Sequence, residues 1–160
     1  MPFILADQRD RDCTQAFADY CAYLASNAEQ FPESAYALAT SDWYFDFTDH
    51  RCPHDARLIS GIIQEQGKFG QGTPPSIKIR LLGAHGDGFI ELEYTQVFHY
   101  ALSYKGELHG HQDWRYDEFR VTDAGHVVHE IEWCGPTDTG NWLIEASDVS
   151  CTWFPGVKTE

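Results

Sequence analysis

The sequence predicts an α+β fold, in which an N-terminal helix and a short second helix pack on a mostly antiparallel, strongly curved meander sheet or partly open barrel. Before Ser41 the apolar side chains recur at helical spacing, and after it they alternate with a period of two. Turn-forming residues separate the later segments, without the intervening helices that parallel βαβ units require. We expect one domain over 1–160, helical over 1–40 and antiparallel β over 41–154.

The first helix is predicted over residues 10–28, with Asp10 or Asp12 as its N-cap. A second, short helix is expected to begin at Pro32, because proline suits the first turn of a helix. The aromatic segment 43–47 is a short strand or an extended segment. The buried face of the first helix is one apolar stripe: Phe17, Tyr20, Cys21 and Leu24.

Strand patterns fill the rest of the chain, and two of them alternate acidic with apolar residues. Glu91 and Glu93 face away from their apolar neighbours, and so do Glu130 and Glu132. Such strands are half-buried, with a negative outer surface. The predicted strands span 57–65, 77–83, 89–94, 97–104, 114–122, 126–133 and 142–149.

The chain is strongly acidic, with 25 acidic and 11 basic residues and a net charge of −14. This balance argues against nucleic acid and anionic membranes as partners, because both are polyanions. Acidic residues are concentrated between Glu107 and Asp148, where there are ten of them and only two basic residues, Arg115 and Arg120. That density exceeds what solubility requires and favours a basic protein partner, whose approach it would steer.

The five cysteines form no CxxC pair and are odd in number, so we expect free thiols rather than a disulfide framework. No stretch of the sequence has the pattern of a signal peptide or of a membrane span. The expected location is therefore cytoplasmic. We expect no cofactor, and no oligomeric state follows from the sequence.

A metal site is one alternative that the residue types allow. His109, His111 and Asp113 alternate, and on a strand they would face one way as metal ligands do. His85 or His99 could supply another ligand. We favour a polar hairpin tip with solvated imidazoles, because Gly110 and the neighbouring turn residues make a poor scaffold.

Cysteine and histidine also cluster at residues 50–55, where a zinc site would need further ligands that the spacing does not provide. Two Cys–His nucleophile pairs are conceivable, Cys52 with His54 and Cys134 with His129. Neither pair lies in a recognisable orienting motif. We therefore interpret these residues as structural.

The segment 114–120 is the strongest candidate for a binding surface, because it interleaves aromatic and charged residues. Trp, Tyr and Arg are enriched at protein interfaces. Alternation would place Trp114, Tyr116 and Glu118 on one face and Asp117 and Phe119 on the other. The predicted partner-binding residues are Asp113, Trp114, Tyr116, Asp117, Glu118, Glu130 and Glu132.

From about His54 onward the chain resembles small, β-rich bacterial proteins, some of which are similar to immunity proteins of polymorphic or contact-dependent toxin systems. The resemblance implies an inhibitor that needs no active site. It carries over no catalytic residue and names no toxin class. The motifs that carry it are HDARL (54–58), DGFIELEY (87–94), VFHYALSY (97–104), DEFR (117–120), HEIEW (129–133) and WLIEASDVSCTW (142–153).

The sequence therefore favours a non-enzymatic protein that binds and neutralises a basic partner, such as a toxin, through an acidic sheet face. Complementary charge would speed the encounter, and close charge pairs would add affinity. The alternative is a metal-dependent or small-molecule enzyme that uses His109, His111 and Asp113 in the mouth of the sheet. A third interpretation is a ligand-binding sheet with an aromatic pocket.

Overall fold

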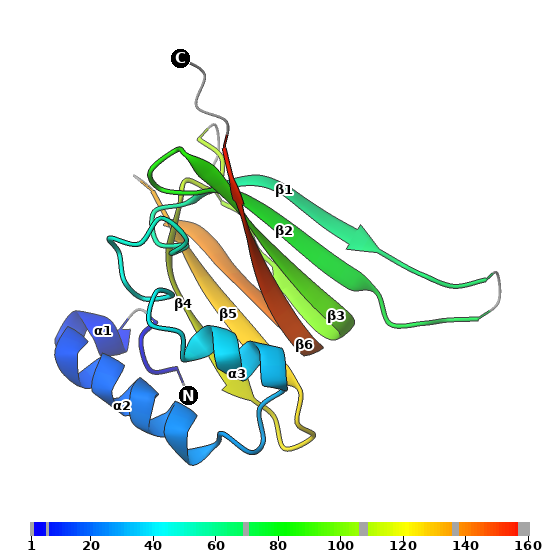
Figure 1. The fold of residues 1–160 in the computed structure, drawn as a ribbon, viewed down its shortest axis with the longest axis horizontal. Helices are drawn as coiled ribbons and strands as arrows, with labels where there is room; N and C mark the ends of the chain where they lie inside the picture. Colours follow the sequence, from blue (N-terminus) through cyan, green and yellow to red (C-terminus); the bar gives the residue numbers. More distant parts are fainter. Residues whose placement is uncertain (1, 6, 69–70, 106–108, 136–137, 157–160) are drawn as a thin grey trace.

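The computed structural model describes residues 2–5, 7–68, 71–105, 109–135 and 138–156. Three helices lie together against one side of a curved sheet of six long strands (Figure 1). The helices are α1 (Asp7–Arg11), α2 (Cys13–Ser26) and α3 (Glu33–Ala39). The strands are β1 (Arg57–Gln64), β2 (Ser76–Leu82), β3 (Gly88–Leu102), β4 (Asp113–Val121), β5 (Val127–Cys134) and β6 (Asp138–Pro155).

The strands form a ring in the order β1-β2-β3-β6-β5-β4, and every neighbouring pair is antiparallel. The ring is uneven, because β1 and β4 meet at a single residue pair, Arg57 with Asp113. The predicted α+β fold, with helices on a strongly curved antiparallel sheet, is confirmed. The strand order is not that of a simple meander, because β6 lies between β3 and β5 in the ring.

The helical region differs from the prediction at one point. Asp12 has an extended backbone, with φ −156° and ψ 95°, and its side chain accepts a hydrogen bond from the backbone N–H of Gln15. It is therefore the N-cap of α2, and it separates this helix from α1, which was not predicted. The second predicted helix is present, and Pro32 stands at its N-cap position.

Two strand predictions were wrong. The segments 89–94 and 97–104 belong to one strand, β3, which continues through a bulge between Val97 and His99. Gln96, directly before the bulge, has φ +49°, and the apparent break in the pattern is an irregularity within one strand. The segment 43–47 forms turns rather than a strand, and these turns place the Tyr44 side chain in the core.

The helical layer covers the gap where β4 lacks a strand neighbour. The Tyr20 hydroxyl accepts from the backbone N–H of Phe119 at 2.7 Å and donates to its carbonyl at 3.1 Å. The Tyr23 hydroxyl accepts from the N–H of Val121. Two tyrosines of α2 thus satisfy backbone groups that an edge strand would leave exposed.

The inner side of the ring is filled with large side chains, among them Trp114, Trp133 and Tyr94, each at most 1 % exposed. They pack with the apolar faces of α2 and α3 in one core. Among the described residues, no helix is both long enough and apolar enough to cross a membrane.

Candidate functional site

The β4–β5 hairpin carries the residues predicted to bind a partner, and the structure corrects how they face. A bulge between Trp114 and Tyr116 breaks the expected alternation. Trp114 therefore points into the ring together with Asp117, and both are at most 2 % exposed. Glu118 is opposite Glu130 on the outer side, yet it is fully buried. Three of the seven predicted residues are thus buried and inaccessible to a partner: Trp114, Asp117 and Glu118.

Asp117 is the centre of a buried polar network in the core. Its carboxylate accepts hydrogen bonds from Trp114 Nε1 at 2.8 Å, from the Tyr44 hydroxyl at 2.7 Å and from His129 Nε2 at 2.7 Å. The other ring nitrogen of His129, Nδ1, lies 2.6 Å from the Tyr94 hydroxyl. Three donors surround one buried carboxylate, which is the arrangement that makes a buried charge tolerable.

The network has the residue types of a proton relay but lacks access to a substrate. Burial raises the pKa of Tyr44 and of Tyr94 well above 10, so both hydroxyls stay protonated. The depression in the surface beside Tyr44 and Asp117 has no volume that would admit a water molecule. The network is therefore suited to fixing the core rather than to catalysis.

Glu118 is covered by the start of the chain itself. One of its carboxylate oxygens accepts from the backbone N–H groups of Phe3 at 2.8 Å and Ile4 at 2.9 Å. Burial raises the pKa of Glu118, and these hydrogen bonds, with Arg120 at 3.5 Å, oppose that rise. The N-terminal segment thus occupies the outer side of β4 at this point.

The remaining hairpin residues are also held by groups of the same chain. Glu132 forms an ion pair at 3.1 Å with Arg9, whose guanidinium lies 4.1 Å from the ring centre of Tyr116. Glu130 pairs with Arg120, and Asp113 lies 3.6 Å from Arg57. The expectation that few bases offset this hairpin was wrong, because Arg9 reaches it from the N-terminal segment.

Acidic residues that lack a basic neighbour among the described residues lie instead on the helical layer. Residues 10–46 contain seven acidic residues, all exposed, and one base, Arg11. Asp10 contacts Arg9, but no basic group of the described chain lies within 4 Å of the other six carboxylates. A charge count over this window would have shown the imbalance. The six are Asp12, Asp19, Glu29, Glu33, Asp42 and Asp46.

An apolar groove lies in the same layer, between α2 and α3, with a volume of about 330 Å³. Three acidic residues are close in the sequence to residues that line this groove. Glu33 is one helical turn before Tyr36, while Asp42 and Asp46 directly follow Ser41 and Phe45. The lining residues include Phe17, Cys21, Leu24, Tyr36 and Phe45, and the Cys21 thiol is free and exposed.

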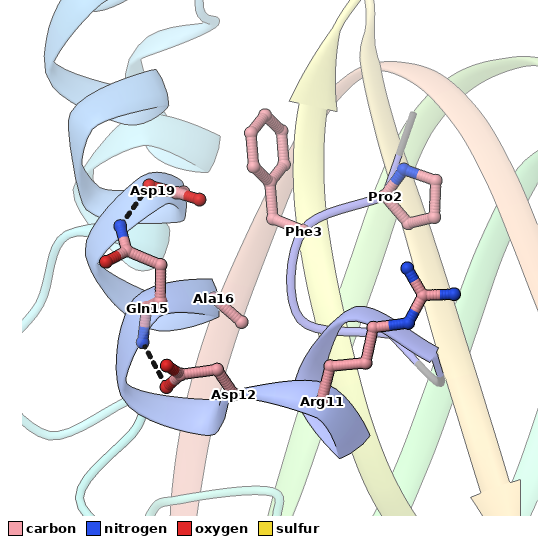
Figure 2. Close-up of a pocket in the computed structure, with 7 residues that line it drawn as sticks. All are labelled: Pro2, Phe3, Arg11, Asp12, Gln15, Ala16 and Asp19. Carbon is pink, nitrogen blue, oxygen red and sulfur yellow. Dashed lines mark hydrogen bonds between the residues drawn. The ribbon is translucent and has the colours of Figure 1, made fainter.

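A second depression, of about 310 Å³, separates α2 from the first residues of the chain (Figure 2). Its polar side chains bond to one another along the helix. Gln15 donates to Asp19 at 2.7 Å, and Asp12 accepts from the Gln15 backbone. Figure 2 shows the Arg11 guanidinium extending toward Pro2, away from these carboxylates. The groups therefore do not converge on a common point.

The predicted histidine cluster does not assemble a metal site. The His111 ring packs against Trp133 and Trp142, with ring centres 5.2 and 5.1 Å apart, and burial lowers its pKa. Within the described ranges, no three His, Cys, Asp or Glu side chains are grouped as metal ligands. His111 instead closes one end of the aromatic core, beside Tyr104.

The cysteines do not form catalytic pairs either. Cys52 is buried and donates to the Tyr44 carbonyl at 2.9 Å, and burial raises the pKa of its thiol to about 12. It therefore stays protonated and is not a nucleophile near neutral pH. Cys134 is exposed while His129 is fully buried, so that pair is not formed.

No protein-family model, no curated protein and no solved structure matches the chain. The site must therefore be judged from its geometry. On the helical layer, exposed acidic residues lie close in the sequence to an accessible apolar groove.

Proposed function

We propose that this chain is a non-enzymatic protein that binds a basic partner protein, and that the helical layer is its binding surface. The observation that carries the proposal is the groove of about 330 Å³ between α2 and α3, in a layer whose acids are exposed. An apolar anchor of the partner would enter the groove, and basic side chains around it would meet Glu33, Asp42 and Asp46. Interfaces are commonly built in this way, with a desolvated anchor and a charged rim.

We keep the basic partner that the sequence predicts, but we place its contact on the helical layer instead of the β4–β5 hairpin. Glu130 and Glu132 are already paired within the chain, so recruiting them would require displacement of Arg120 and Arg9. The helical carboxylates need no such exchange. A rigid antiparallel ring behind α2 would keep the groove in shape and limit the entropy lost on binding.

The partner that the resemblance favours is a toxin, which the chain would inhibit in the cytoplasm of a bacterium. Coexpression with a toxin-like protein encoded by the adjacent gene is the direct test. Growth should be rescued by the chain and lost with Glu33→Lys/Asp42→Lys. Rescue that is unaffected by this variant would contradict the role of the helical layer.

The surface itself can be tested without knowing the partner. A short peptide with several lysines around one phenylalanine would be titrated into the ¹⁵N-labelled chain. We expect saturable shifts at Phe17, Cys21 and Tyr36, and much smaller ones when the phenylalanine is replaced by alanine.

A charge-matched pair of variants separates local from global electrostatics in that titration. Glu33→Lys/Asp42→Lys and Glu93→Lys/Asp123→Lys change the net charge equally, but only the first lies at the groove. The first should weaken binding about tenfold or more and the second severalfold less, because only the first reverses carboxylates that adjoin the residues lining the groove and exposed charges interact more weakly with distance. Equal effects, or shifts confined to β4 and β5, would refute the proposed surface.

A further inference from the structure

We propose that β1 is a self-association surface, where the free edges of two β1 strands from two copies of the chain pair antiparallel about a two-fold axis at Gly61. On one side β1 is paired with β2 from Arg57 to Gln64, apart from an irregularity at Ile59. On its other side only Arg57 is paired, with Asp113 of β4. Along Ser60–Gln64, no strand of the described chain lies on that side, so its backbone groups are open to another strand.

The free edge is also apolar. Ile59, Ile62 and Ile63 are 53 %, 52 % and 45 % exposed. Exposed edges are usually protected by charged residues or proline, and residues 58–64 contain neither. The hairpin of β1 and β2 extends away from the rest of the ring (Figure 1), so the helices do not cover this edge.

The charge pattern selects a second copy as the occupant. At a net charge of −14, most approaches between two copies are repulsive. The uncharged stretch 58–64 is instead flanked by Arg57 at one end and Glu65 at the other. Antiparallel pairing centred on Gly61 brings Glu65 of each copy to the Arg57 end of the other strand. The edge position there is taken by Asp113, which also lies 3.6 Å from the Arg57 guanidinium, so the contact at this end is between the side chains of Arg57 and Glu65 rather than a backbone pair.

The space around β1 allows this approach. Arg57, Leu58 and Ile59 line a depression of about 290 Å³ together with residues 109–112, which keeps that end of the edge accessible. The register with β2 shifts between Leu58 and Ser60, so the new ladder is most regular over Ser60–Ile62. The long Arg57 side chain, 74 % exposed, spans the irregular end. So short an interface predicts a weak dimer, with a Kd of about 1–100 µM.

Sedimentation velocity of the full chain, from about 1 µM to 1 mM, tests the proposal. The intact chain should pass from monomer to dimer over this range. Arg57→Glu and Glu65→Arg should each weaken the dimer about tenfold or more, because each variant places like charges opposite one another. Mixing the two variants should restore a 1:1 heterodimer, because their charges are then complementary at both ends.

Two controls keep the result interpretable. Arg115→Glu makes the same charge change on β4 and should leave the dimer intact. Ile62→Lys should abolish the dimer while the circular dichroism of the monomer is kept. A chain that stays monomeric at all concentrations, or a dimer that both charge variants leave unchanged, overturns the proposal. Neither result bears on the groove between α2 and α3, which lies on other elements.

Discussion

Asp117 and His129 form a hydrogen bond of 2.7 Å in the interior of the ring, where both residues are at most 2 % exposed. The Asp117 carboxylate already accepts from Trp114 Nε1 and from the Tyr44 hydroxyl, and the tautomer that fits this acceptor role has the His129 proton on Nε2. The Tyr94 hydroxyl, kept protonated by its raised pKa, donates to Nδ1. Asp117, which was predicted to bind a partner, thus instead joins three buried side chains of the core by hydrogen bonds.

Replacing Asp117 by alanine should cost about 3–5 kcal/mol in the free energy of unfolding, because three buried donors lose their acceptor. Urea denaturation at pH 7 measures this cost. Asp123→Ala, in the exposed turn between β4 and β5, should change the free energy by less than about 0.5 kcal/mol. A small effect at Asp117 would show that water or another group satisfies the donors.

Tyr20→Phe should destabilise the chain by about 1–3 kcal/mol, because it leaves both the N–H and the carbonyl of Phe119 without a partner. Tyr23→Phe removes a single contact, with the half-buried N–H of Val121, and should cost less. Hydrogen exchange at Phe119 and Val121 would report each loss locally. The reverse order of effects would contradict the role of α2 as the cover of the β4 edge.

Stability should fall in alkali. The folded pKa of Cys52 is raised from 9.0 to about 12, and those of Tyr44 and Tyr94 are raised well above 10.0. The unfolded chain then releases protons that the folded chain retains, so stability is complete below pH 9 and is lost as the pH rises above it.

Thermal unfolding under reducing conditions should therefore give a constant Tm from about pH 7 to 8.5 and a decline above about pH 9. Burial raises the pKa of Cys151 from 9.0 to about 12 as well, so only the double variant Cys52→Ala/Cys151→Ala should delay the decline until close to pH 10, where tyrosine ionises in the unfolded chain. A Tm that is flat to pH 11 would contradict the burial of these groups.

Glu118→Gln tests the buried end of the hairpin. The folded pKa of Glu118 is raised above 4.5, so its contribution to stability is present in acid and is lost as the pH rises through the folded pKa. The amide oxygen of Gln can still accept from Phe3 and Ile4. Relative to the variant, the native chain should therefore lose stability as the pH rises above 4.5. An unchanged difference would mean that Glu118 is solvated.

The fold was predictable because its signals are local. The α2 stripe from Phe17 to Leu24 and the alternation around Ile90 and Ile131 each require only neighbouring residues. The course of residues 41–47 was not predictable, because Tyr44 turns inward to reach Asp117 on a distant strand. The conformation of this segment depends on that tertiary contact, and its apolar residues follow neither helical nor strand periodicity.

The placement of the acids was harder to predict than the fold. Alternation assigned Trp114 and Glu118 to the same face, but one bulged residue at Arg115 reverses the side on which Trp114 lies. The burial of Glu118 depends on Phe3 and Ile4, more than a hundred residues earlier. No local pattern reveals such a contact, whereas the excess of acid over base in residues 10–46 could have been counted.

The central claim is that the helical layer, and not the β4–β5 hairpin, meets the partner. Two exposed thiols report on these places, Cys21 in the groove and Cys134 at the end of β5. Alkylation rates at both, measured by mass spectrometry with and without the lysine-rich phenylalanine peptide, test the claim directly. We predict that the peptide protects Cys21 severalfold and leaves Cys134 unchanged; protection of Cys134 alone, or of neither thiol at saturating peptide, would contradict it.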